Sequence, residues 1–198
     1  QFAKAPNPPK VTAVPGDGVV TLYWDRSAES TQDKYMGNIT NGADLYDFEG
    51  YKIYRATDFE FNDAYNITDG DGNPTFLEPY VQNGVRAQWD LVDGKSGWHP
   101  VDLNGIKFYL GDDTGLTHSY VDHNVVNGQR YYYAVVSYDY GGDLSNNIIP
   151  SDSPMKLRVN PLTGAVSLGP NVVEVVPSPP SAGFVDASFA GDQVDHVL

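Results

Sequence analysis

The clearest strand signal in the chain is the stretch Gln129-Arg-Tyr-Tyr-Tyr-Ala-Val-Val-Ser-Tyr-Asp139. Successive side chains of a β-strand point to opposite faces, so Tyr131, Tyr133 and Val135 share one face. The opposite face carries a second, mainly apolar set: Tyr132, Ala134, Val136 and Tyr138. The pattern therefore predicts a strand that is partly covered on both faces.

Two further strands are indicated near the start of the chain. Val11–Val14 and Val19–Trp24 are separated by the turn residues Pro15-Gly-Asp-Gly18, which predicts a hairpin-like pair. Alternate positions of the second strand form one apolar face: Val20, Leu22 and Trp24. We expect these in the core with the inward residues of Gly50–Arg55 and of the strand at 129–139: Tyr51, Ile53, Tyr131, Tyr133 and Val135.

The remaining sequence favours strands and loops over helices. Residues 25–47 are polar and predict a long loop, and Met155–Val159 predicts a closing strand. Residues 59–115 are rich in Gly, Asp and Asn but carry scattered aromatic side chains, which predicts a folded insertion. Short strands are expected within it at Val85–Leu91 and Ile106–Leu110. No apolar stripe with a helical period appears in the chain.

The composition excludes several classes of protein. The 198 residues are 40% apolar without a long apolar run, which predicts a globular chain with no membrane span. Twelve Lys and Arg residues against 26 Asp and Glu residues give a formal net charge of −14, which argues against nucleic acid as a partner. Cys does not occur, so disulfides, thiolate metal sites and cysteine nucleophiles are excluded.

Four separated segments, in the same order, resemble the fibronectin type III domain. Pro9–Trp24 resembles its proline-led first strand and the second strand that ends in a buried Trp. Gly50–Arg55 resembles the third strand, and Ser119–Asp122 with Val125–Tyr131 is similar to the segment that leads into the sixth.

The last of these segments resembles the family's tyrosine corner. The family pattern is Leu-x-Pro-Gly-x-x-Tyr; here Gly128 and Tyr131 match, while Val125 replaces the Leu and Asn127 replaces the Pro. The resemblance implies that the Tyr131 hydroxyl is tied to the backbone a few residues upstream.

The resemblance implies an all-β, immunoglobulin-like (fibronectin type III) β-sandwich over residues 9–159, with an insertion of roughly 57 residues at 59–115. Residues 1–8 are Pro-rich and are expected to be an N-terminal linker. Residues 160–198 are expected to be an extended Pro-rich tail or a connector to a following domain. Domains of this family generally serve extracellular or cell-surface adhesion, spacing or assembly, so we expect a secreted protein.

The insertion contains a candidate calcium loop, Thr68-Asp-Gly-Asp-Gly-Asn-Pro74. Alternate oxygen donors in a tight loop turn towards one hard cation. The candidate ligands are Asp69, Asp71, Asn73 and Glu78. The motif is partial, because Pro74 stands where a calcium loop has Gly and Tyr80 where it has a bidentate Glu. A plain turn rich in Asp and Gly is the alternative.

Two aromatic residues of the insertion, Trp89 and Trp98, are candidates for a surface that binds sugar rings or a partner protein. Flat aromatic faces give a large contact area at low entropic cost. The alternative is that they form a small core of the insertion. The four His residues include no close ligand pair, and no nucleophile or phosphate-loop motif predicts catalysis. A pair of acidic residues for glycoside hydrolysis stays open as an alternative.

The tail contains one segment with the composition of a strand, at residues 171–176. It has no evident partner in the sequence, and an unpaired strand can add to the edge of a neighbouring sheet. We therefore expect four valines to contact a neighbouring copy or a following domain: Val172, Val173, Val175 and Val176. The alternative is a flexible connector.

Together these features predict a non-catalytic extracellular or cell-surface module for protein–protein assembly or adhesion. Its expected partners are other proteins or copies of itself, reached through a sheet edge or the tail strand. The alternative is a carbohydrate-binding or accessory domain of a secreted hydrolase, with glycans as partners. Calcium is the one cofactor that the sequence suggests.

Overall fold

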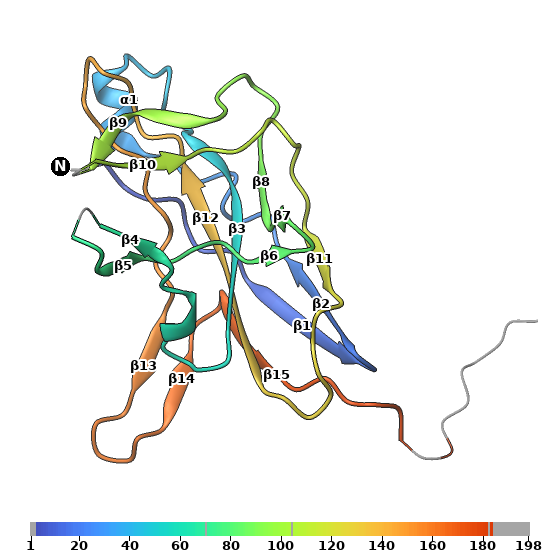
Figure 1. The fold of residues 1–198 in the computed structure, drawn as a ribbon. Helices are drawn as coiled ribbons and strands as arrows, with labels where there is room; N and C mark the ends of the chain where they lie inside the picture. The colour runs from blue at the N-terminus through green and yellow to red at the C-terminus, as the bar shows by residue number, and fades with distance from the viewer. Residues whose placement is uncertain (1–2, 70, 104, 182, 184–198) are drawn as a thin grey trace, which may run out of the picture.

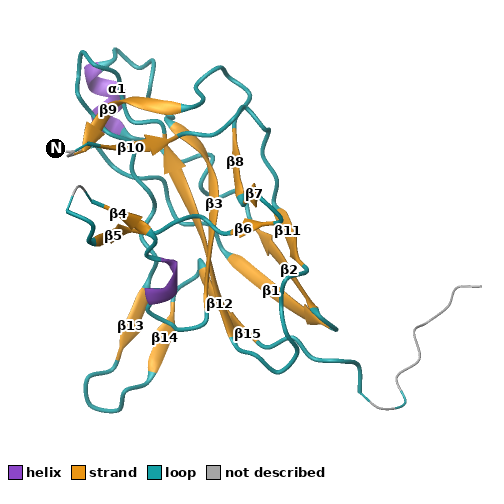
Figure 2. Cartoon of the chain, viewed as in Figure 1, coloured by secondary structure: helices purple, strands orange, loops and turns teal. Residues whose placement is uncertain are grey.

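The structure is a computed structural model and describes residues 3–69, 71–103, 105–181 and 183. Strands dominate it, and the helical segments within these residues are short (Figures 1 and 2). In chain order the elements are β1 (Val11–Gly16), β2 (Val19–Trp24), α1 (Lys34–Ile39), β3 (Phe48–Ala56), the 3-10 helix η1 (Asn62–Ala64), β4 (Ile67–Thr68), β5 (Pro74–Phe76), β6 (Val81–Gln82), β7 (Val85–Arg86), β8 (Gln88–Asp90), β9 (Trp98–Leu103), β10 (Ile106–Tyr109), β11 (Ser119–Asp122), β12 (Tyr131–Asp139), β13 (Leu157–Val159), β14 (Val166–Leu168) and β15 (Val172–Val175).

Two antiparallel sheets form the body of the molecule. One has three strands in the order β1-β2-β11, and the other has four in the order β15-β12-β3-β8. The expected pairing of the first two strands is confirmed, with Val11 opposite Trp24 and Gly16 opposite Val19. The protein is therefore predominantly β, as the sequence predicts.

The main core lies between these sheets, because buried residues of both belong to one cluster. β2 supplies Val20, Leu22 and Trp24, which lie against residues of β3 and β12. All eight core residues predicted from the sequence are buried in this cluster: Val20, Leu22, Trp24, Tyr51, Ile53, Tyr131, Tyr133 and Val135. Removing one large aliphatic side chain from such a core costs about 2–5 kcal/mol.

A second apolar cluster covers the opposite face of the four-stranded sheet. β12 contributes Tyr132, Ala134 and Val136 to it, and the insertion contributes Phe61 and Ala64. Both faces of β12 are thus buried along its length, which confirms the expectation from its sequence. The insertion folds onto this sheet face.

Both outer strands of the three-stranded sheet have partners for their free edges. The Gln82 side chain donates to the Val121 carbonyl at 3.1 Å and accepts from the His123 N–H at 2.8 Å, so its amide substitutes for a strand beside β11. At the other edge, the Val11 N–H donates to the Pro170 carbonyl and the Ser178 N–H donates to the Gly16 carbonyl. Covered edges are a means by which β-proteins avoid unwanted strand addition.

The closing strand differs from the expectation. Met155–Val159 was predicted to close the fold, but Leu157–Val159 pairs with Val166–Leu168 in a separate hairpin. The last strand of the four-stranded sheet is β15, whose residues Val172 to Val175 pair with β12. The segment therefore has a strand partner in its own chain, at a distance in sequence that the local pattern does not reveal. Periodicity identifies a strand but does not say which edge it joins.

The polar stretch at 25–47 is also not wholly a loop, because it contains α1. The Asp33 carboxylate caps this helix by accepting the N–H groups of Tyr35 at 2.7 Å and Met36 at 3.0 Å. Six residues are too few to display an apolar stripe with a helical period, which explains why the pattern did not reveal it. Among the described residues no helix is long and apolar enough to cross a membrane.

Candidate functional site

A cleft of about 370 Å3 opens on the insertion side of the four-stranded sheet. Its lining residues come from β3, β7 and β8, from the two hairpins β4–β5 and β9–β10 (Figure 1), and from the segment 149–152. This volume falls in the range of small-molecule sites. The insertion thus builds a concave surface on the sheet.

The rim of the cleft carries an aromatic pair. Trp98 is 62% exposed, and its ring lies edge-to-face against that of Tyr109, with the ring centroids 5.0 Å apart. The guanidinium carbon of Arg86 lies 5.0 Å from the Tyr109 ring centroid. The Tyr109 hydroxyl donates to the Asp112 carboxylate, which fixes the ring from outside the cleft.

Lys52 on β3 forms part of the cleft wall. Its ammonium nitrogen lies 3.1 Å from Oδ1 of Asp152 and 3.5 Å from the centroid of the Phe108 ring. The Tyr54 hydroxyl donates to Oδ2 of the same carboxylate at 2.8 Å. Burial lowers the pKa of Lys52, and the Asp152 carboxylate acts in the opposite direction. This charge is already compensated within the protein.

Gln88 on β8 holds the β9–β10 hairpin to the sheet. Its Nε2 donates to the carbonyls of Tyr109 and Leu110 and to the Tyr138 hydroxyl, at 2.9–3.0 Å. Its Oε1 has no hydrogen-bond donor among the described residues. Gln88 is also one of the residues that line the cleft.

The two candidate tryptophans have different environments. Trp98 lies in the cleft, as a binding residue would. Trp89 instead packs against the main core, with its ring centroid 5.8 Å from that of Trp24. Trp89 is therefore a core residue, as the alternative predicted. The core that it joins lies between the two sheets and is not a separate core of the insertion.

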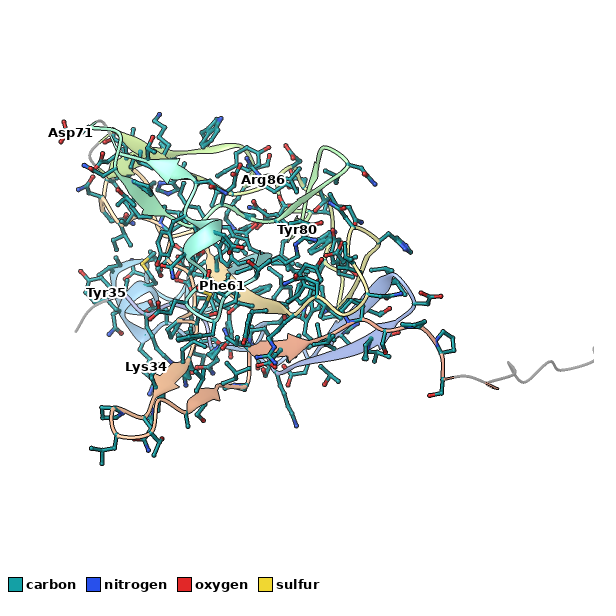
Figure 3. All side chains as sticks on the ribbon, turned by 60° about the horizontal axis from the view of Figure 1, so that its bottom comes forward. Lys34, Tyr35, Phe61, Asp71, Tyr80 and Arg86 are labelled. Carbon is teal, nitrogen blue, oxygen red and sulfur yellow. The ribbon has the colours of Figure 1, made fainter. Side chains whose placement is uncertain are left out.

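The candidate calcium loop forms the turn between β4 and β5. The Asp69 carboxylate accepts the N–H groups of Asp71 at 3.0 Å and Asn73 at 2.9 Å, so it stabilises the turn. Asp71 lies at the outer limit of the molecule (Figure 3). Glu78 follows β5, and its N–H donates to the Ala64 carbonyl. Hydrogen bonding within the turn accounts for the Asp69 position, and calcium binding stays a prediction.

The four tail valines are divided between the core and the surface. Val172 and Val175 are buried, while Val173 is half-buried against the main core and Val176 is exposed. Strand pairing with β12 explains the two buried side chains. Contact of these residues with a partner stays a prediction.

The described histidines have separate surroundings. His99 is buried and its Nε2 lies 2.7 Å from the Gly142 carbonyl, while His118 contacts Glu29 at 2.5 Å. His123 is exposed, and His196 lies outside the described residues. In the part of the chain that the structure describes, no group of three His, Asp or Glu side chains is arranged to hold a metal ion.

No protein-family model, curated protein or solved structure matches the chain. Evidence on function therefore comes from the geometry of the cleft.

Sequence reasoning missed most of the cleft residues, among them Arg86, Gln88 and Tyr109. Arg86 and Gln88 fall in the predicted strand Val85–Leu91, and Tyr109 falls in the predicted strand Ile106–Leu110. Their one sequence signal is alternation in the stretch 85–91, which places Arg86 and Gln88 on the same face of that strand. The position of that face became clear only from the pairing of β8 with β3.

Proposed function

We propose that the chain is an extracellular or cell-surface module on a fibronectin type III-like sandwich. In immunoglobulin-like sandwiches the first, second and fifth strands share one sheet, and the third, sixth and seventh share the other. The order β1-β2-β11 against β15-β12-β3 supports this assignment. A further support is the Tyr131 hydroxyl, which accepts the N–H of Val126 at 3.0 Å, five residues upstream.

The module binds a carbohydrate chain in the cleft, and the observation that carries this proposal is the exposed Trp98 ring beside Tyr109. Sugar rings present flat apolar faces, and rigid aromatic side chains contact such faces at low entropic cost. One carboxylate, that of Asp152, lines the cleft, whereas glycoside hydrolysis commonly uses two. A binding role therefore fits the cleft better than a hydrolytic one.

Substitution of Trp98 tests this proposal. A glycan array identifies a ligand, and calorimetry then compares the original chain with Trp98→Ala and with Tyr23→Ala. Tyr23 is an exposed aromatic residue on β2 of the other sheet, outside the cleft. We expect Trp98→Ala to abolish binding at an unchanged melting temperature and Tyr23→Ala to retain it. No glycan bound by the original chain, or equal affinity in both variants, would contradict the proposal.

A second candidate function is protein assembly, favoured by the hairpin β13–β14. This hairpin projects from the body of the molecule (Figure 1), and Leu162 in its turn is 93% exposed. An exposed apolar tip on a projecting arm suits insertion into a partner. Sedimentation velocity tests this, and Leu162→Glu should raise the concentration at which the chain associates. An original chain that stays monomeric at every concentration would contradict self-assembly.

A further inference from the structure

The charged side chains that line the cleft reverse the charge balance of the chain. They are Lys52, Arg86, Lys107 and Asp152. Three cations to one carboxylate contrast with 12 basic and 26 acidic residues in the whole sequence. The cleft is thus a basic site on an acidic protein.

Two of these cations are not neutralised by the described part of the protein. Lys52 is paired with Asp152, but no described carboxylate lies within salt-bridge distance of Arg86 or Lys107. Asp102 stands opposite Lys107 in the β9–β10 register, and its carboxylate accepts the Gly105 N–H. The cleft therefore offers two unpaired positive charges to a ligand.

The overall charge of −14 does not prevent an anion from binding there. At physiological ionic strength the screening length is about 8 Å, so exposed charges beyond that distance contribute little. A ligand in contact with Arg86 interacts mainly with the local cations. The remote acidic groups slow its approach and leave the local preference in place.

Building on carbohydrate binding in the cleft, we propose that the site selects an acidic polysaccharide whose sugars carry carboxylates. The sugar ring lies against Trp98 and Tyr109, and its carboxylate pairs with the Arg86 guanidinium. A guanidinium matches a carboxylate with two parallel N–H donors, and such charge-assisted bonds are stronger than neutral ones. Lys107 adds a second charge for a neighbouring sugar.

The geometry places charge and aromatic surface close together. The Tyr109 ring contacts both other groups, because its centroid lies 5.0 Å from that of Trp98 and 5.0 Å from the guanidinium carbon of Arg86. The Tyr109 ring thus connects the aromatic contact to the cation. Adjacent groups of a single acidic sugar can reach both.

The test is calorimetry with an oligogalacturonate and with its methyl-esterified form, which has the same backbone without the charge. The variant is Arg86→Gln, and its control is Arg130→Gln. Arg130 is an exposed residue that pairs with Glu174 on β15, outside the cleft, so both substitutions remove one positive charge. Thermal melting of each variant checks that the fold is intact.

We expect the acid to bind at least about tenfold more tightly than the ester, and Arg86→Gln to remove most of that difference. Arg130→Gln should leave the affinity within about twofold. Equal affinity of the original chain for the acid and the ester would overturn the proposed selection of acidic sugars, but it would not contradict carbohydrate binding. Binding of neither sugar, together with an empty glycan array, would overturn the proposed function itself. Tight binding of an oligoaspartate, with neither sugar bound, would make an acidic protein segment the ligand and also overturn the inference.

Discussion

Glu49 carries a carboxyl group that is fully buried beside β8 and makes no hydrogen bond with any described residue. Burial raises its pKa to about 8, and the nearby Asp93 carboxylate raises it further than Lys95 lowers it. At neutral pH this side chain is therefore protonated in the folded protein. In the unfolded chain the same group titrates near its ordinary pKa and is ionised.

The first prediction concerns the pH dependence of stability. Between the unfolded pKa of Glu49 and its folded value near 8, the folded state holds a proton that the unfolded state releases. Stability therefore falls as the pH rises through this window, and Asp47 and Asp139, whose pKa values burial raises to about 7, act in the same direction. From pH 5 to pH 8 the free energy of unfolding should therefore fall less in Glu49→Gln than in the original chain. The difference between the two should be about 1 kcal/mol or more.

Urea denaturation at the two pH values measures this effect, with Glu60→Gln as the control. Glu60 is exposed in the same chain, so its substitution should leave the pH dependence unchanged. An unaltered pH dependence in Glu49→Gln would show that this carboxyl group is ionised in the folded protein.

A second prediction concerns Tyr131. Tyr131→Phe leaves the ring in the core and removes the acceptor of the Val126 N–H, so the free energy of unfolding should fall by about 1 kcal/mol. Tyr23→Phe, an exposed tyrosine on β2, is the control and should be neutral. Equal stability of both variants would mean that the Tyr131 hydroxyl does not stabilise the turn before β12.

At the scale of elements, Gln82 shows how one side chain protects a strand. Gln82→Ala leaves the Val121 carbonyl of β11 and the N–H of His123, the residue after β11, without their partner. We expect about 1 kcal/mol lower stability and more self-association, because an unpaired edge invites another strand. Gln129→Ala is the control, since the Gln129 side-chain amide donates to the carbonyl of its neighbour Arg130 and, among the described residues, to no other group. Unchanged stability and association in Gln82→Ala, measured by denaturation and sedimentation, would contradict this role.

Strands with strong alternation could be predicted, but their partners could not. Tyr131, Tyr133 and Val135 could be identified as core residues because side chains at every second position of a strand share one face, and this alternation is visible in the local sequence. The pairing of β15 with β12 joins segments about 40 residues apart, and no local pattern encodes that choice. The same limit applies to the cleft, where Trp98 could be proposed by residue type while Arg86 could not. Arg86 meets Tyr109 only through the packing of separate hairpins.

For the whole molecule, we expect the fold to depend on β15, because this strand pairs with β12 and buries two valines. A chain that ends at Val159 loses the strand that pairs with Tyr131–Ala134 and the buried Val172 and Val175. It should lose its cooperative unfolding transition, whereas a chain that ends at Ser181 keeps every described strand and should unfold normally. Circular dichroism during heating measures this transition. Equal melting temperatures for both chains would show that residues 160–181 do not stabilise the fold.

If the cleft beside Trp98 binds a carbohydrate, the ligand changes the surroundings of the Trp98 indole, and an amide and indole nuclear magnetic resonance titration detects that change. The chain has three tryptophans, so its spectrum has three indole N–H signals. On addition of oligogalacturonate, the Trp98 signal should shift and saturate, while that of Trp24, which is buried in the main core, should stay in place. A Trp98 signal that does not move at saturating ligand, or shifts confined to residues outside the cleft, would show that the cleft does not bind the carbohydrate.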